Sequence, residues 1–180
     1  AMEKPVLHDL SIGSLALDPM ALFDKRWFLL TAGDFAAGRY NTMTVSWGSL
    51  GTVWNKPFAQ VFCRPQRHTF RFLEAFPTFT LSTFRPACRG ALQLLGSKSG
   101  RDGNKIQESG LTPVAAKQVA APTFAEAELV FECRKLYAQF LDPNGFHDPS
   151  VASNYPTRDY HCVYFGEIVA VRGVAAYARE

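Results

Sequence analysis

The residues best suited to contacting a ligand gather in one stretch of the sequence, NTMTVSWGSLGTVWNKP, at positions 41–57. Polar and apolar side chains alternate along it, as in a β-strand with two different faces. Short hydroxyl side chains leave the backbone N–H and C=O groups of a strand accessible, so these groups can bond the rim of a flat heteroaromatic ring. The alternative is a barrel strand whose Thr and Ser side chains face solvent. The candidate residues are Asn41, Thr42, Met43, Thr44, Ser46 and Trp47.

A basic cluster, RPQRHT at positions 64–69, follows the next strand-like run. Arg64 and Arg67 supply guanidinium groups, and Thr69 supplies a hydroxyl in the first turn of an expected helix. Guanidinium groups and the free N–H groups of a helix N-terminus both favour a phosphate. His68 could assist them. The alternative interpretation is a solvated basic turn.

A third cluster, SKSGRDGNK at positions 97–105, combines hydroxyl groups, cationic side chains and glycine. Ser97 and Ser99 offer hydrogen-bond donors to an anion. Gly100 permits a close approach of the backbone, and Lys105 can return from the following helical turn. An ordinary polar loop has the same composition, so this cluster is informative only together with the other two.

The elements that must position these clusters follow from the hydrophobic periodicity, in which period two predicts strands and period 3.6 predicts helices. Strands are expected at about 28–33, along the stretch 41–57, and at 58–64, 78–84, 125–140 and 160–174; helices are expected at 69–76, 87–96 and just before Gly110. Residues 142–159 form a polar, turn-rich excursion of the kind that borders sites. This order favours an antiparallel β barrel over alternating βαβ units.

Composition sets the class of protein. Of the 180 residues, 47% are hydrophobic and 19% are charged, which suits a single folded domain over 1–180. The net charge of +3 is too mild to indicate a nucleic-acid partner. The sequence shows no signal-peptide pattern and no run of membrane-spanning length, so we expect a cytoplasmic protein without a membrane partner.

Dinucleotide, P-loop and metal motifs are missing from the sequence. G-x-G-x-x-G follows no expected strand, and GSKSGRD lacks the terminal Lys-Ser/Thr of a P-loop. The four cysteines form no C-x-x-C pair, so we expect reduced, mostly buried thiols and no metal site. A bound nucleotide must therefore be held by some other device.

Six sequence blocks, in their order along the chain, resemble the flavin reductase-like proteins with an FMN-binding split barrel, and especially their flavoredoxin-type branch. The blocks are NTMTVSWGSLGTVWNKP, VFCRPQRHTF, TFTLSTF, GSKSGRDGNKI, LVFECRKLYAQFLDP and DYHCVYFGEI, from about Asn41 to Ile168. The resemblance implies a mainly β fold: a six-stranded antiparallel split β-barrel with short connecting helices. It also implies noncovalent FMN binding and a homodimer.

The resemblance assigns roles by motif. Asn41, Thr42, Met43 and Thr44 would line the edge of the isoalloxazine ring, with Ser46 and Trp47 beside it. Arg64, Arg67 and Thr69 would hold the phosphate with help from the 97–105 loop. Cys63 is included among the cofactor-binding residues as a packing side chain and not as a reactive thiol.

His161 lies in DYHCVYFGEI, which matches a His-to-Gly-Glu pattern common among flavin reductases. There it would lie on the open side of the flavin, near the place where a nicotinamide would stack. The alternative is a strand histidine that pairs across the dimer.

Two functions are consistent with this resemblance. One is a flavin oxidoreductase that transfers electrons from NADH or NADPH through bound FMN to a flavin or another acceptor. The alternative is an FMN electron carrier that is reduced by a protein partner and has no NAD(P)H activity of its own. A third, weaker interpretation is a split barrel that binds another cofactor, such as F420 or haem, or none. In the first two functions the cofactor supplies the chemistry, so no catalytic side-chain nucleophile is required. The sequence accordingly shows no Ser/His/Asp or Cys/His catalytic set.

Overall fold

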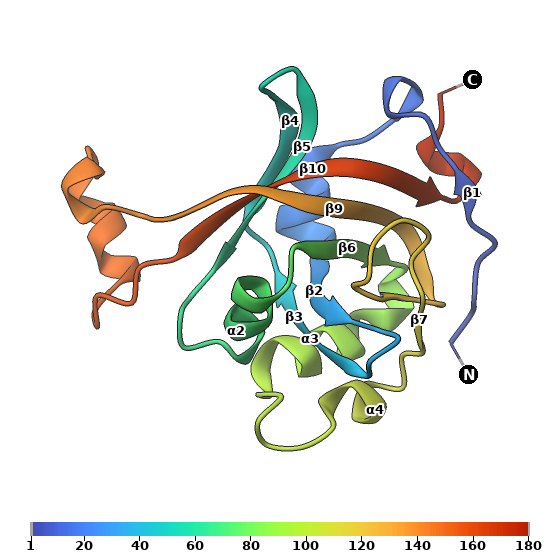
Figure 1. The fold of residues 1–180 in the computed structure, drawn as a ribbon, viewed down its shortest axis with the longest axis horizontal. Helices are drawn as coiled ribbons and strands as arrows, with labels where there is room; N and C mark the ends of the chain where they lie inside the picture. The colour runs from blue at the N-terminus through green and yellow to red at the C-terminus, as the bar shows by residue number, and fades with distance from the viewer. Residues whose placement is uncertain (1, 180) are drawn as a thin grey trace.

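The computed structural model describes residues 2–179 and is built around one large antiparallel sheet (Figure 1). Its main strands run in the order β3-β2-β6-β9-β10-β5-β4. Their bounds are β2 Phe28–Asp34, β3 Arg39–Val45, β4 Gly48–Val53, β5 Lys56–Cys63, β6 Thr78–Phe84, β9 Ala127–Phe140 and β10 Cys162–Gly173. The short β1, His8–Asp9, pairs with β10. In a separate small sheet, β7 (Pro113–Val114) pairs with β8 (Thr123–Phe124).

Short helices connect the strands. They are α1 Pro19–Ala21, α2 His68–Ala75, α3 Arg89–Ser97 and α4 Lys105–Ser109. Brief 3₁₀ or π segments are η1 Ile12–Ser14, η2 Leu22–Arg26, η3 Pro86–Cys88, η4 Pro143–Gly145, η5 Pro149–Asn154 and η6 Ala175–Tyr177. The helices expected at 69–76, 87–96 and before Gly110 are thus confirmed as α2, η3 with α3, and α4. Gly110 ends α4 with φ 74°, a left-handed conformation that favours glycine.

The antiparallel barrel class is confirmed, but the strand count differs from the expected six. The stretch 41–57 forms two strands, because β3 pairs with β2, with Val45 opposite Phe28, whereas β4 pairs with β5. β3 and β4 lie at opposite ends of the strand order, yet only Ser46 and Trp47 separate them in the chain. The sheet must therefore curl until its ends approach each other, and Ser46 and Trp47 lie at the seam of this split barrel.

Gly48 makes the seam possible. A Cβ at this position would lie 2.3 Å from the ring of Phe23 and 2.5 Å from the backbone oxygen of Gln60. Because no side chain fits there, the glycine of the TVSWGS stretch has a packing role as the first residue of β4.

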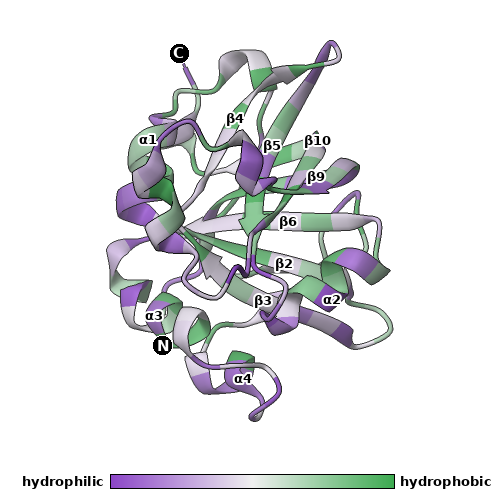
Figure 2. Cartoon of the chain, turned by 90° about the vertical axis from the view of Figure 1, so that its left-hand side faces the viewer, coloured by the Kyte–Doolittle hydropathy of each residue, from purple (hydrophilic) through white to green (hydrophobic). Residues whose placement is uncertain are grey.

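Hydrophobic side chains pack on both faces of the sheet. Along β2, Leu30 belongs to the cluster inside the barrel and Leu29 to the cluster that includes residues of α3 and α4. Figure 2 shows mostly hydrophobic strands in the middle of the sheet and a largely hydrophilic α4 outside it. All four cysteines are free and buried, which confirms the expectation for them. The sheet therefore has a packed core on each of its two faces.

A segment that we call the arm, residues 141–161, joins β9 to β10. It contains η4 and η5 and projects from the barrel, at the left of Figure 1. β9 and β10 remain paired out to its base, where Cys162 lies opposite Phe140. The polar excursion expected at 142–159 is this arm.

Candidate functional site

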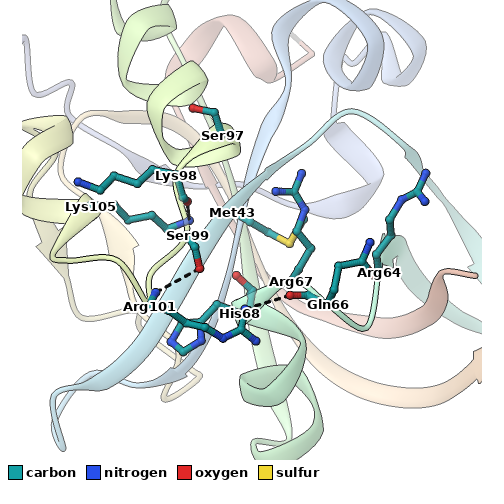
Figure 3. Close-up of a pocket in the computed structure, with 11 residues that line it drawn as sticks. Met43, Arg64, Gln66, Arg67, His68, Ser97, Lys98, Ser99, Arg101 and Lys105 are labelled. Carbon is teal, nitrogen blue, oxygen red and sulfur yellow. Dashed lines mark hydrogen bonds between the residues drawn. The ribbon is translucent and has the colours of Figure 1, made fainter. Parts of the chain in front are cut away.

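A cavity of about 330 Å³, which we call the basic cavity, opens beside the N-terminus of α2. It is lined by Met43, Arg64, Gln66, Arg67, His68, Thr69, Ser97, Lys98, Ser99, Arg101 and Lys105. In Figure 3 the 97–105 loop and the 64–68 turn reach in from opposite sides, with Met43 between them. The two basic clusters of the sequence therefore form one site.

Two arginines of the basic cavity are held by backbone carbonyls. The Nη1 atom of Arg67 donates to the oxygen of Gly96 at 3.0 Å, and that of Arg101 donates to the oxygen of Gln66 at 3.0 Å. Within residues 2–179 neither arginine has a carboxylate partner. Their positive charges are therefore available to an anion.

Lys105 is the most buried cation of this cavity, with 4% of its surface exposed. Its Nζ donates to the oxygens of Leu95 at 2.8 Å and Lys98 at 3.0 Å, at the negative end of the α3 dipole. Burial, and then the nearby charge of Arg67, lowers the pKa of Lys105 from 10.5 to about 8. Lys105 therefore loses its charge at mildly alkaline pH.

We expect phosphate binding in the basic cavity to weaken as the pH rises through about 8, which is the pKa of Lys105 in the chain without a bound phosphate. A bound anion stabilises the protonated amine, so binding takes up a proton and its affinity falls above that pKa. Titration of the chain with FMN from neutral pH to about pH 9.5 measures this slope. Lys105→Gln, which is uncharged throughout, should bind more weakly and lose the slope. A wild-type affinity that stays constant over this range would contradict the expectation.

The 97–105 loop packs tightly against β3 and α2 at Gly100. A Cβ there would lie 2.4 Å from Oδ1 of Asn41 and 2.9 Å from Cδ2 of His68. Asn41 in turn donates from Nδ2 to Oγ1 of Thr69 at 2.8 Å. Neither Asn41 nor Gly100 lines the basic cavity, but together they fix the loop against its opposite wall.

A second cavity, of about 180 Å³, lies at the barrel seam; we call it the aromatic cavity. Its lining is Met43, Thr44, Val45, Ser46, Trp47, Phe62, Arg64, Arg67 and His161. Met43, Arg64 and Arg67 line both cavities, so the two cavities adjoin each other. The ring of His161 lies 5.2 Å from that of Trp47, which is 46% exposed. A flat ring can therefore enter beside aromatic surfaces.

His161 is nearly buried, and its Nδ1 atom lies 2.8 Å from the hydroxyl of Tyr155 in the arm. Burial, followed by the positive charge of Arg64, lowers the pKa of His161 from 6.5 to about 4, although Asp159 opposes the change. The imidazole is therefore neutral at pH 7. Tyr155 occupies one ring nitrogen, which leaves Nε2 for another partner.

Arg64 connects the arm to the rim shared by both cavities. Its Nη1 atom donates to Oδ2 of Asp159 at 2.6 Å, and its Nη2 atom donates to the oxygen of Asn154 at 2.8 Å. Its guanidinium carbon also lies 5.0 Å from the ring centre of Tyr155. Hydrogen bonds from Arg64 and then Gln66 hold the pKa of Asp159 well below its usual range. In this state Arg64 is paired with the arm, unlike Arg67.

The two threonines of the first stretch differ in their surroundings. Thr42 is fully buried, and its Oγ1 atom lies 2.8 Å from Oγ1 of Thr31 and 3.2 Å from the oxygen of Leu30. Thr44 donates to the oxygen of Leu92 in α3 at 2.5 Å and also lines the aromatic cavity. Thr42 lines neither cavity.

Cys63 lies in the barrel core, with its Sγ atom 3.5 Å from Sδ of Met43. Burial raises the pKa of its thiol to about 12, so it is protonated at neutral pH. It lies behind Met43 and lines neither cavity. Its position is that of a packing residue.

The structure thus brings ten of the predicted residues to the two cavities: Met43, Thr44, Ser46, Trp47, Arg64, Arg67, Thr69, Ser97, Ser99 and Lys105, with His161 as a further one. Asn41, Thr42, Cys63 and Gly100 lie behind them. The lining also contains Gln66, Lys98 and Arg101, which belong to the predicted clusters but had no role assigned to them. Sequence reasoning missed Val45 and Phe62 in the lining, and Tyr155 and Asp159 in the arm. Val45 and Phe62 adjoin predicted residues, which was a usable signal. Tyr155 carries no local signal, because its contact depends on how the arm folds back.

Among residues 2–179, no group of three or more His, Cys, Asp and Glu side chains is placed to hold a metal ion. Within the same range, no helix has the length and apolar character needed to cross a bilayer. The assignment of one domain to 1–180 and the cytoplasmic location remain predictions.

The strand order defines a split barrel, the fold of the solved FMN-binding domain described below. The sequence model described as "Flavin reductase like domain" matches residues 20–179, and the chain belongs to this family. Among curated proteins, no sequence matches it.

Solved structures confirm the fold. The FMN-binding domain of a flavin reductases-like enzyme from Shewanella baltica OS155 is 16% identical with a TM-score of 0.69, covering 95% of this chain and 78% of that one. Flavoredoxin of Desulfovibrio vulgaris (Miyazaki F) is 23% identical, with a TM-score of 0.65 and coverages of 92% and 76%. The NADH:FAD oxidoreductase SgcE6 of Streptomyces globisporus C-1027 is 16% identical, with a TM-score of 0.62 and coverages of 84% and 77%.

Proposed function

We propose that the chain is an FMN-dependent oxidoreductase that takes electrons from NADH or NADPH and passes them to a flavin or another acceptor. The observation that carries the proposal is that the basic and aromatic cavities adjoin each other at Met43, Arg64 and Arg67, which line both. FMN has the same two parts, a phosphate and a flat ring, joined by a short ribityl chain. The family of the chain supports this cofactor, as does the FMN-binding domain among the similar structures.

The side chains present at each end fit FMN. At the basic end, Arg67, Arg101 and Lys105 carry charge that no carboxylate within residues 2–179 neutralises. At the other end, Trp47 and Phe62 supply aromatic surfaces beside the seam. A planar ring against aromatic walls with an anionic tail among cations satisfies both cavities.

Bound FMN would supply hydride acceptance and electron transfer. The residues of the chain would bind and orient it and limit the access of water. His161 offers a neutral imidazole in the lining of the aromatic cavity, so it can contact a neutral or cationic group of the donor without repelling it.

The proposal is tested by the colour of the purified protein. We expect a yellow preparation that releases FMN, rather than FAD, into the supernatant on heating. A chain that is colourless and shows no binding of added FMN at micromolar concentration would overturn the proposal.

His161→Ala is expected to slow reduction by NADH or NADPH while leaving FMN affinity nearly unchanged, because the phosphate contacts lie in the other cavity. Stopped-flow bleaching of the flavin band measures the rate, and fluorescence titration measures the affinity. His147→Ala is the matched control, since this histidine is an exposed residue of the same arm. An equal loss of FMN affinity would instead make His161 a cofactor-holding or dimer residue.

The competing function is an electron carrier reduced by a protein partner, and the similarity to a flavoredoxin favours it. The stopped-flow experiment separates the two functions in the wild-type chain. Rapid bleaching by either nicotinamide donor supports the enzyme. Reduction only by dithionite or a partner protein supports the carrier.

A further inference from the structure

A third cavity, of about 470 Å³, lies between the start of β3 and the outer side of α2; we call it the arginine groove. It is lined by Gly38, Arg39, Tyr40, Arg71, Phe72, Ala75 and Phe76. None of these residues has a role in the two cavities already described. The groove therefore needs its own explanation.

The groove combines cations with flat aromatic surfaces. The guanidinium carbon of Arg39 lies 5.7 Å from the ring centre of Phe76, and that of Arg71 lies 5.2 Å from that of Phe72. The two phenylalanine rings are nearly parallel, at 11°, with centres 6.3 Å apart. Over residues 2–179, neither arginine forms an ion pair with a carboxylate. Such a surface suits a ligand with a planar base and a phosphate.

The arginine groove adjoins the basic cavity through His68. This residue lines the basic cavity, and its ring meets that of Phe72 edge-on at 5.4 Å. After burial, the positive charges that lower the pKa of His68 are those of Arg71, Arg101 and Lys105. The charge of Arg71 in the groove thus acts on the same imidazole as two cations of the basic cavity.

We propose that the arginine groove is a binding subsite for an adenosine phosphate. The adenine ring lies against Phe72 and Phe76, and the phosphate pairs with Arg39 and Arg71. Two ligands carry this chemistry: FAD, whose adenylate continues from the phosphate that FMN also has, and NADPH, whose adenosine bears a 2′-phosphate. The proposal deepens the proposed function, on which it rests for the ligand in the neighbouring cavity.

The test titrates the FMN-saturated chain with 5′-AMP and 2′-AMP by calorimetry. The double variant Arg39→Ala/Arg71→Ala should weaken adenylate binding by about tenfold or more. Both side chains are exposed, so the fold should tolerate their removal. Arg179→Ala, which removes an exposed arginine near the C-terminus, should leave it unchanged.

The source of the adenosine phosphate is distinguished by two comparisons. A preference for 5′-AMP, with a ratio of FAD to FMN affinity that falls in the double variant, identifies the FAD tail. A preference for 2′-AMP, with a ratio of FAD to FMN affinity that the double variant does not change, identifies NADPH.

The proposal is overturned if neither adenylate binds the wild-type chain at millimolar concentration, or if the double variant binds both as tightly as the wild type. It is also overturned if the double variant loses FMN affinity to the same extent as adenylate affinity. The same titration on the FMN-free chain separates this failure from that of the proposed function. If FMN does not bind but adenylate binding still depends on Arg39 and Arg71, only the proposed function fails.

Discussion

Arg67→Ala is expected to weaken FMN binding by about tenfold or more, because one charge-assisted hydrogen bond to a phosphate contributes roughly 1.5–3 kcal/mol. Arg67 lines both cavities, and within residues 2–179 the only hydrogen bond of its side chain is to the backbone oxygen of Gly96. Fluorescence titration of the FMN-free chain measures the loss. Arg67→Lys keeps the charge but not the planar fork, so it should recover part of the affinity.

Arg64 should behave differently from Arg67 in the same titration. Its two hydrogen bonds to Asp159 and Asn154 tie it to the arm, so Arg64→Ala removes a charge from the cavity and also releases the arm. The double variant Arg64→Ala/Arg67→Ala should show the largest loss of FMN affinity. An unchanged affinity in that variant would disprove the phosphate site.

The second large effect concerns the oligomeric state. We expect a homodimer that buries an aromatic surface formed by Trp54, Phe58, Tyr137 and Phe165. Trp54 and Tyr137 are 59% and 43% exposed, and the ring centre of Phe165 lies 5.4–6.2 Å from those of the other three. Aromatic surface on this scale is seldom left uncovered on a monomer.

The backbone at the tip of the β4–β5 hairpin supports this surface. Trp54 and Asn55 have φ of 51° and 57°, which is the turn conformation that favours Asn and Gly. A tryptophan in this conformation is costly, and its exposed ring at a protruding tip points to a contact outside the chain (Figure 1). A second copy of the chain presents the same hairpin, so it is the occupant that we expect.

Trp54→Glu/Tyr137→Glu should convert the dimer to monomers of the 20.0 kDa chain mass, because two carboxylates would be buried without partners at the interface. Light scattering at micromolar protein measures the change. Glu substitution at Met20, which is also apolar and 84% exposed but outside this surface, is the matched control. A wild-type mass near 20.0 kDa would contradict the dimer itself.

The sequence by itself determined most of the local structure. The apolar segment at 28–33 and the alternation at 78–84 reappear as β2 and β6, and the helical run at 69–76 reappears as α2. The clusters at 64–69 and 97–105 were recognisable as anion-binding candidates from their residue types alone. Side-chain period, turn residues and charge are local properties, so they can be read without knowing the contacts.

Only the tertiary structure decided which face of each element meets the cavities. Alternation places Thr42 and Thr44 on one face of β3, but the sequence does not say that Thr44 reaches Leu92 of α3 and lines the aromatic cavity, whereas Thr42 is buried against Thr31. The division of 41–57 into two strands likewise depends on partners, because β3 pairs with β2 and β4 with β5. Strand partners are chosen by contacts distant in sequence, which periodicity does not encode.

The same limit applies to the contacts between distant segments. Tyr155 reaches His161 because the arm folds back on its own base, and Arg39 joins Arg71 because α2 lies beside the start of β3. Neither pair shares a motif. The types of these side chains were visible in the sequence, whereas their juxtaposition follows from how the barrel closes and where its connections cross.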